Sequence, residues 1–384
     1  MYAAPVFQVP KMTSAPALNG KSSNVWEQAS DIFGFFDRRS GNLELREGKT
    51  FFGYDNKNLY ICVQSELPPD GVKLLSSVRR RDGRVFKDDS IELWIAPEGQ
   101  NHYYQYTVNS LGTICDIRHD RTGKIPDETW SANWKQANYL DKKSNQWVYE
   151  VAIPLKDLNI TGNPDGKKVK MLIARNWYRP WNQTPFIPNS APFNDLKQYA
   201  EFVLNPEAPA IQVDTIGKEL EKQLFNLRGT IRNNSRKAKQ YDLGLRFSHS
   251  DMPETFQSQK IKAAPGETVK FAFDDDGGHI HLRASHKAVL TVKDGKKEIY
   301  NVPFAYKLPI ERENAWKIAN KISNKFQFAV YPSFKKAAIR FDAEKNADSA
   351  VAAIRLDGKT VCEQKPHRCF CLDSAKRSDL FAVL

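Results

Sequence analysis

A run of alternating residues at positions 90 to 95 combines side chains that could grip a polar ligand. Apolar residues at 91, 93 and 95 alternate with Ser90, Glu92 and Trp94. Successive side chains of a β-strand point to opposite faces, so these three residues share the face away from the core. A carboxylate beside a flat aromatic ring suits a sugar, because sugar hydroxyls donate strong hydrogen bonds to a carboxylate and sugar rings have apolar faces.

The next run of the chain could extend this face. Gln105, Thr107 and Asn109 alternate with aromatic and aliphatic residues in the segment 103–109. If this segment pairs with 90–95 as an antiparallel hairpin, its three polar side chains lie beside Glu92. The alternative is an ordinary solvated sheet face, which the same pattern fits equally well.

Short alternating runs separated by turn residues position these side chains. The expected strands lie at 59–63, 90–95, 103–109, 113–118, 147–153, 169–177 and 199–204. Seven of the eight tryptophans fall within the first 205 residues, which indicates an aromatic-rich core or a stacking surface. We assign Trp26 and Trp147 to the core, whereas Trp130 and Trp134 fit either role. The pattern predicts an all-β protein that begins with an antiparallel β-sandwich over residues 1–205.

Two further segments follow the linker Asn-Pro-Glu-Ala-Pro-Ala. Residues 206–308 contain about seven short strand patterns, which is typical of an immunoglobulin-like β-sandwich. Residues 309–384 predict a partial β domain, either truncated or with a disordered tail. There we expect a short helix around Trp316 and strands at 326–331 and 336–342, with no strand pairing after residue 368.

Composition narrows the classes of function. The chain has 384 residues, 41% hydrophobic and 27% charged, as in a soluble globular protein. No apolar stretch approaches the roughly 18 residues that span a bilayer, and no signal peptide is visible. About half of the net charge of +12 lies in 307–384, away from the aromatic-rich segment, so nucleic acid is not an expected partner.

The sequence indicates neither a metal site nor a cofactor. Cys362, Cys369 and Cys371 lack the paired knuckles of a structural zinc site. The acidic stretch 274–278 lacks the pattern of a calcium loop, and we interpret it as a solvated loop.

Six ordered motifs carry a family resemblance. They are Ala17-Leu-Asn-Gly with Trp26, Gly53-Tyr-Asp-Asn-Lys-Asn-Leu-Tyr-Ile, Phe86-Lys-Asp-Asp-Ser-Ile-Glu-Leu, Tyr104-Gln-Tyr-Thr-Val-Asn, Tyr149-Glu-Val-Ala-Ile-Pro and Tyr199-Ala-Glu-Phe. With them, residues 13–204 resemble carbohydrate-binding module family 9. The resemblance implies a DOMON-like β-sandwich that binds sugars, often at chain ends, between two tryptophans on loops at one edge.

The resemblance also implies site residues, with departures. Phe86 and Phe193 fall on the two tryptophan positions, and Glu92 matches the acidic residue of the family. Thr107 replaces a basic residue that contacts sugar hydroxyls, and Asn189 lies near a loop asparagine. Smaller rings and a lost cation imply a different sugar, or a site completed by other residues.

We expect those other residues among Arg175, Trp177 and Trp181. The predicted function is thus a non-catalytic glycan-binding module whose partner is an oligo- or polysaccharide. The resemblance implies an extracellular or periplasmic location, within a larger polysaccharide-degrading or surface protein.

Three alternatives remain. The first is a structural scaffold that binds no ligand. The second is a haem-binding module, as in related sandwiches, for which Met171 with His119 or His102 would be the axial ligands. The third is an enzyme with paired carboxylates; Glu92, Asp89 and Glu150 are available, but the sequence has no catalytic motif, and we predict that the chain is not an enzyme.

Overall fold

The computed structural model describes residues 5–20, 23–44, 46–68, 72–179, 181–188, 191–217, 225–249, 252–275 and 285–306, together with six strands after residue 324. Strands dominate these residues, and the described helices are four short 3-10 turns: η1 (Asn24–Gln28), η2 (Val85–Lys87), η3 (Leu155–Leu158) and η4 (Leu196–Gln198). The all-β fold class predicted from the alternation is confirmed.

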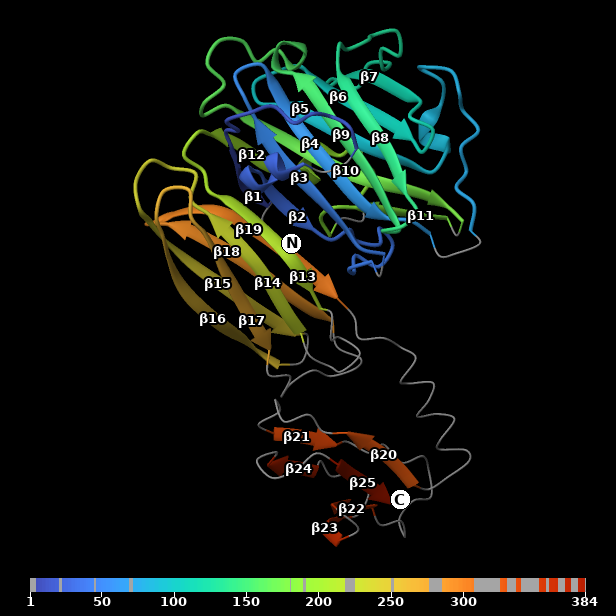
Figure 1. Ribbon diagram of the computed structural model, residues 1–384. Coiled ribbons are helices and arrows are strands. Elements are labelled where there is room, and N and C mark those ends of the chain that lie inside the picture. Colours follow the sequence, from blue (N-terminus) through green and yellow to red (C-terminus); the bar gives the residue numbers. More distant parts are fainter. Residues whose placement is uncertain are drawn as a thin grey trace. The chain divides into compact units, whose positions relative to one another are not determined.

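Two sheets form the first sandwich (Figure 1). In spatial order, the larger sheet contains β1 (Val6–Pro10), β12 (Ala200–Asn205), β10 (Lys168–Tyr178), β5 (Ser90–Pro97), β6 (His102–Asn109) and β7 (Ile114–Asp120), with β11 (Trp181–Pro185) paired to β10. The other sheet has five strands: β2 (Ser30–Phe33), β3 (Gly48–Tyr54), β4 (Asn58–Glu66), β9 (Gln146–Pro154) and β8 (Lys135–Asp141).

The core lies between the inner faces of these sheets. Phe52 of the five-stranded sheet packs on Phe202 of the larger sheet, with ring centroids 4.6 Å apart. Trp147 and Trp177 meet edge to face across the same interface, 6.2 Å apart. Aromatic side chains bury large apolar areas, so these contacts hold the sheets together. Trp26 and Trp147 are buried as predicted.

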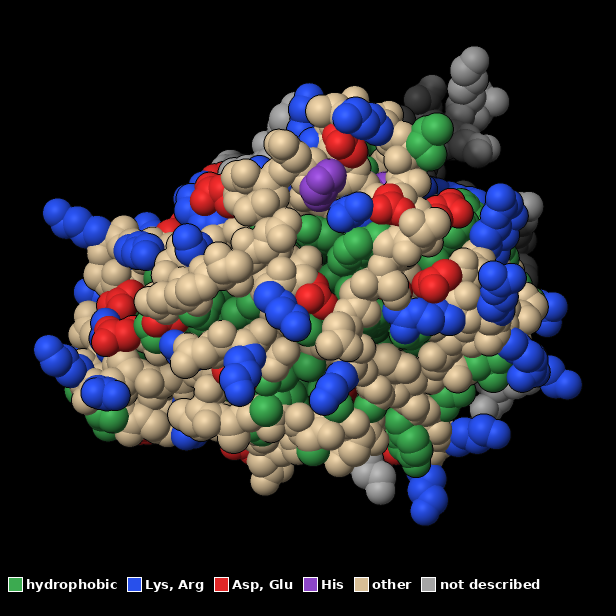
Figure 2. All heavy atoms as spheres, turned by 90° about the horizontal axis from the view of Figure 1, so that it is seen from above, with side chains coloured by type: hydrophobic (Ala, Val, Ile, Leu, Met, Phe, Trp, Pro, Cys, Tyr) green, Lys and Arg blue, Asp and Glu red, His purple; other side chains and the backbone are tan. Residues whose placement is uncertain are grey.

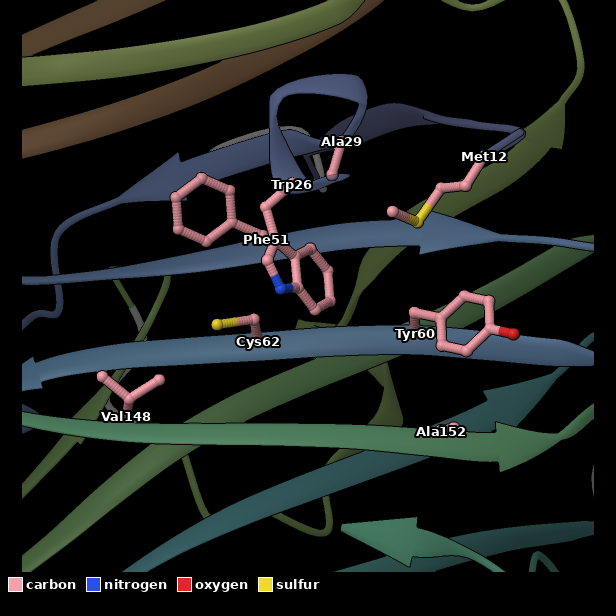
Figure 3. Close-up of a cluster of buried hydrophobic side chains, with 8 residues drawn as sticks. All are labelled: Met12, Trp26, Ala29, Phe51, Tyr60, Cys62, Val148 and Ala152. Carbon is pink, nitrogen blue, oxygen red and sulfur yellow. The ribbon is translucent and has the colours of Figure 1, made fainter. Parts of the chain in front are cut away.

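Both outer faces are partly covered by connecting segments. On the five-stranded sheet, the segment 12–29 packs Met12, Trp26 and Ala29 over Phe51 and Cys62 (Figure 3). On the larger sheet, Val78, Val85 and Phe86 pack over residues of β7. Trp26 thus belongs to a covering layer outside the five-stranded sheet.

A second sandwich follows. Its sheets are formed by β13 (Ala210–Ile216), β14 (Phe225–Arg232) and β17 (Thr268–Asp275), and by β15 (Lys239–His249), β16 (Met252–Ala263), β18 (His286–Asp294) and β19 (Lys297–Tyr306). These seven strands match the number predicted for an immunoglobulin-like sandwich.

The two sandwiches are joined by strand pairing. β19 pairs with β1 at Phe7 and Tyr300, so the larger sheet of the first sandwich continues into the second. Phe7 and Tyr300 also stack edge to face at 5.1 Å. Much of the chain up to Tyr306 accordingly forms one compact unit, and the predicted boundary at residue 205 stays a prediction.

The last part of the chain belongs to a separate compact unit. Its strands are β20 (Lys325–Ala329), β21 (Lys336–Ile339), β22 (Ala352–Leu356), β23 (Lys359–Gln364), β24 (Phe370–Asp373) and β25 (Asp379–Val383). β25 pairs with β20 and β22, so the prediction of no strand pairing after residue 368 is wrong. That prediction failed because the two short strands after residue 368 are separated by the polar run Ser-Ala-Lys-Arg-Ser at 374–378, so no alternation can be followed from one to the other. The helix expected around Trp316 lies outside the described residues.

Among the described residues, no helix is long and apolar enough to span a membrane. Figure 2 shows basic and acidic side chains interspersed over one face of the molecule, with hydrophobic side chains visible between them.

Candidate functional site

The predicted hairpin forms, and it brings the polar side chains together. β5 and β6 are antiparallel, with Ser90 opposite Asn109 and Glu92 opposite Thr107. Trp94 lies opposite Gln105 in the same register. Directly opposed residues share a face, so these six side chains line the outer face of the larger sheet. We call this surface the Glu92 face.

The carboxylate of Glu92 is held by three side-chain donors from three strands. Asn176 Nδ2 on β10 donates to Oε1 at 2.5 Å, while Trp94 Nε1 and Gln105 Nε2 each donate to Oε2 at 2.9 Å. Burial raises the pKa of Glu92, and these three hydrogen bonds oppose that rise. A carboxylate fixed in this way is a pre-oriented acceptor.

The hydrogen bonds continue to both sides of Glu92. Gln183 Nε2 on β11 donates to Asn176 Oδ1 at 3.0 Å, and Arg38 in turn donates to Gln183. On the other side, Gln105 Oε1 lies 3.1 Å from His119 Nε2. The row therefore runs from a guanidinium at one end to an imidazole at the other.

An aromatic cluster adjoins the imidazole end. His119 stacks on Tyr103 with centroids 4.7 Å apart, and Trp94 lies 5.1 Å from the same imidazole. Burial lowers the pKa of His119 to about 4, so the imidazole is neutral near pH 7. A neutral imidazole has one donor and one acceptor nitrogen and matches a hydroxyl group.

The two phenylalanines implied by the family resemblance lie on opposite flanks of Glu92. Phe86 packs against Cys115 and Ile117 of β7. Phe193 lies under the guanidinium of Arg38, 5.4 Å from ring centroid to Cζ, at the flank where Arg38 reaches Gln183. Phe86 is partly exposed, whereas Phe193 is 7% exposed.

The loop that carries Phe86 is anchored by two carboxylates. Asp88 accepts hydrogen bonds from the backbone amides of Ser77 and Val78, and Asp89 accepts from Leu75 and Tyr178. Accepting these bonds lowers the pKa of Asp88 despite its desolvation. Both aspartates therefore have a structural explanation, which is to hold the loop onto the sheet.

The polar side chains of the Glu92 face are largely buried. Glu92 is 4% exposed, Gln105 5% and Thr107 1%, and Asn109 is fully buried. Asn109 donates to Asp88 and to the Val78 carbonyl, so it supports the loop. The hydroxyl oxygen of Thr107 is buried without a hydrogen-bond partner among the described residues.

The other predicted site residues lie elsewhere. Arg175 alternates with Asn176 on β10, so it points to the inner face, where it is fully buried and donates to Thr184, Ser65 and backbone carbonyls. Burial lowers its pKa to about 9. Trp177 also faces inward, against Trp147.

The structure therefore places Arg175 and Trp177 on the inner face, apart from the other predicted site residues. An alternating strand cannot present residues 175 and 177 on the face that holds residue 176. Trp181 is 47% exposed and stacks under Arg39 instead, with 4.9 Å from Cζ to ring centroid. Asn189 lies outside the described residues.

Five residues that the sequence did not assign to this face complete the row and its aromatic end. They are Arg38, Tyr103, His119, Asn176 and Gln183. Asn176 and His119 could have been found by extending the alternation of the face to β10 and β7. Arg38 and Gln183 could not, because their contacts join segments 145 residues apart.

The register argues against one of the two axial pairs of the haem alternative, Met171 with His119. Met171 pairs with Ile95 on the inner face, whereas His119 lies opposite Tyr103 on the outer face. These two side chains therefore cannot reach one iron from the same side of the sheet. No group of three potential metal ligands occurs among the described residues.

Comparisons with known proteins add structural neighbours. No protein-family model matches the sequence, and no curated protein matches it either. A candidate carbohydrate-binding protein from Bacteroides uniformis is similar over 53% of this chain and 100% of its own, at 13% identity and a TM-score of 0.45. A family 9 carbohydrate-binding module from Caldicellulosiruptor kristjanssonii, in complex with cellotriose, is similar over 53% of this chain and 94% of its own, at 13% identity and a TM-score of 0.39.

An enzyme also appears among the neighbours. A β-glucuronidase from Bacteroides uniformis covers 71% of this chain, but only 28% of that enzyme is matched, at 12% identity and a TM-score of 0.19. These similarities are too distant to assign a ligand or an activity, which must be argued from the residues of this chain.

Proposed function

We propose that this chain is a non-catalytic glycan-binding protein whose Glu92 face recognises an oligo- or polysaccharide. The observation that carries the proposal is the Glu92 carboxylate, held by three neutral donors and flanked by Phe86 and Phe193. The six ordered motifs of the sequence support the same assignment.

The chemistry of the row suits a polyhydroxylated ring. Amides, a neutral imidazole and a carboxylate alternate donors with acceptors, as neighbouring sugar hydroxyls require. Trp94 and Tyr103 add apolar surface next to these groups. Arg38 supplies a guanidinium near the row, and we propose that it takes the part of the basic residue replaced by Thr107.

Binding requires rearrangement of the loops that carry Phe86 and Phe193, because Glu92 is 4% exposed. A hydroxyl that reaches Oε1 or Oε2 must replace a hydrogen bond that already exists. Such an exchange reduces the net gain, so we expect a dissociation constant in the micromolar to millimolar range.

Calorimetric titration of the full chain tests this proposal. Gluco-, xylo-, manno- and galacto-oligosaccharides are each compared with their reduced-end forms. In Glu92→Gln, which keeps the shape but loses the charge, we expect binding to weaken about ten-fold or more. The matched control is Glu98→Gln, since Glu98 lies just beyond β5 with its side chain 66% exposed.

The outcomes separate two functions. Binding that is weakened about ten-fold or more in Glu92→Gln, with no change in the control, supports the proposal, and binding that disappears on reduction indicates recognition of the reducing end. If a cooperatively folded protein releases no heat with any of these sugars, the proposal is contradicted. The scaffold alternative would then be favoured, because the polar groups of the face already bond to one another.

We further propose, from the family resemblance alone, an extracellular or periplasmic protein that acts within a larger polysaccharide-degrading or surface assembly. On this proposal Glu92, Asp89 and Glu150 are not catalytic. Asp89 holds a loop. Glu150 lies on the other sheet, where it accepts hydrogen bonds from Trp26 and from two backbone amides. Release of reducing sugar from any glycan by the purified chain would overturn this.

A further inference from the structure

A groove lies on the outer face of the five-stranded sheet, on the opposite side of the sandwich from the Glu92 face. Its volume is about 560 Å³, within the range of small-molecule sites. The residues used in the argument are Phe33, Lys49, Gln64, Tyr139, Gln146 and Asp214. We call this surface the Tyr139 groove.

The floor of the Tyr139 groove is a row of directly opposed residues. Phe33 pairs with Lys49, Lys49 with Gln64, Gln64 with Val148, and Val148 with Tyr139. The row crosses the five strands of the sheet on one face. It has an aromatic ring at each end, Phe33 and Tyr139, and the ammonium of Lys49 and the amide of Gln64 lie between them.

One wall of the groove is fixed by a buried carboxylate. Glu150 accepts from the backbone amides of Asn19 and Gly20 at 2.9 and 2.7 Å, and from Trp26 Nε1 at 2.8 Å. This clamp sets Gly20 against Tyr139. A side chain there would overlap Tyr139 Cβ, and Gly20 has the positive φ of +69° that favours glycine.

The polar groups of the floor remain available to a ligand. The side-chain amides of Gln64 and Gln146 make no hydrogen bond within the described part of the chain, and Tyr139 is 42% exposed. Lys49 Nζ lies 3.8 Å from both Asp31 and Asp214, so its charge is already balanced.

We infer that the Tyr139 groove is a second carbohydrate site, specific for neutral sugar residues. The ring of Tyr139 offers a stacking face, and the two amides offer paired donors and acceptors to adjacent hydroxyls. Glu47, Asp141 and Asp214 also line the groove and make it unfavourable for a uronic acid or a sulfated sugar. The inference uses the ligand class of the proposed function but none of its residues.

The test uses the full chain with Glu92→Gln, so that the Glu92 face contributes little. Cellotetraose, xylotetraose and mannotetraose are titrated, each beside an oligosaccharide that ends in glucuronic acid. We expect one neutral tetraose to bind the Glu92→Gln protein with a stoichiometry near one. Adding Tyr139→Ala or Gln64→Ala should weaken that binding about ten-fold, and the glucuronate-ended oligosaccharide should bind more weakly than the neutral sugar.

Phe256→Ala is the matched control, because Phe256 is an exposed aromatic residue on β16, in the second sandwich. It should leave the affinity unchanged. If the original chain binds a neutral sugar but the Glu92→Gln protein does not, or if neither Tyr139→Ala nor Gln64→Ala alters the binding that remains in Glu92→Gln, the inference is overturned while the proposed function stands. If Glu92→Gln binds like the original chain and Tyr139→Ala abolishes binding, the inference stands and the proposed function fails. A protein that binds none of these sugars overturns both.

Discussion

The two outer faces of the first sandwich hold similar side chains in opposite states. On the Glu92 face, the carboxylate, amides and imidazole bond to one another, and the central carboxylate is 4% exposed. In the Tyr139 groove, Gln64 and Gln146 have no such bonds to the residues that the structure describes, and Tyr139 is 42% exposed. The difference arises from what covers each face.

This contrast separates orientation from availability. Bonded groups on the Glu92 face are held in place, but a ligand must exchange existing hydrogen bonds for new ones. Groups in the Tyr139 groove are ready to bond, but a ligand must first restrict their rotamers. The predictions below test which state favours binding.

The largest effect is expected from removing the clamp that shapes the Tyr139 groove. Glu150→Ala leaves Trp26 Nε1 and the amides of Asn19 and Gly20 without their acceptor in a buried place. We expect the free energy of unfolding to fall by about 3 kcal/mol or more, measured by chemical denaturation.

The matched variant for Glu150→Ala is Glu66→Ala. Glu66 accepts from the backbone amide of Glu47 at 2.8 Å and is only partly buried. Glu66→Ala should lower the free energy of unfolding clearly less than Glu150→Ala does. Equal losses in the two variants would mean that the clamp has no special role.

A smaller effect, dependent on pH, is expected at Asp31, which lies beneath Lys49 on the same face. Asp31 is fully buried, and burial raises its pKa to about 7 against the attraction of Lys49. The folded state then holds this proton more tightly than the unfolded state does. The stabilisation that comes from the raised pKa of Asp31 is therefore fully present in acid, and it is lost as pH rises toward 7.

Asp31→Asn removes this dependence while it keeps an oxygen for the amide of Val213. Melting temperatures of both proteins from pH 4 to 8 provide the measurement. We expect the free energy of unfolding of the variant to rise relative to that of the original chain as pH rises, by no more than about 4 kcal/mol across the range. A constant difference between the two proteins would show that Asp31 keeps an ordinary pKa.

On the Glu92 face, Phe86→Ala and Phe193→Ala test whether the two flanking rings act together. If both rings contact sugar, each variant should weaken binding about ten-fold with the fold intact, as followed by calorimetry and near-ultraviolet circular dichroism. Phe193→Ala should also lower stability, because this ring is buried under Arg38. An unchanged affinity in both variants would move binding away from this face, toward the Tyr139 groove.

The alternating pattern was sufficient to predict one face of one hairpin. Turn residues and alternation predicted β5 and β6, and their register placed Gln105, Thr107 and Asn109 opposite the polar residues of β5. The same rule, applied to β10, would have kept Arg175 and Trp177 off that face.

Other features depend on contacts that no local pattern encodes. The segment carrying Arg38 reaches β11, and Asp214 of the second sandwich lines a groove of the first. Local alternation gives the faces of a strand, but it does not show what covers them.

The smallest effect, and the one that bears most directly on the comparison, is expected from Thr107→Val. The Thr107 hydroxyl is buried without a partner among the described residues, so replacing it with a methyl group removes an unfavourable desolvation. We expect stability to rise by up to about 1 kcal/mol, measured by chemical denaturation. If a sugar hydroxyl reaches this group when the loops of the Glu92 face rearrange, the more stable variant should bind more weakly. A rise in stability with no change in affinity would mean that the hydroxyl stays buried when sugar binds, and the Tyr139 groove would then be the more accessible of the two faces.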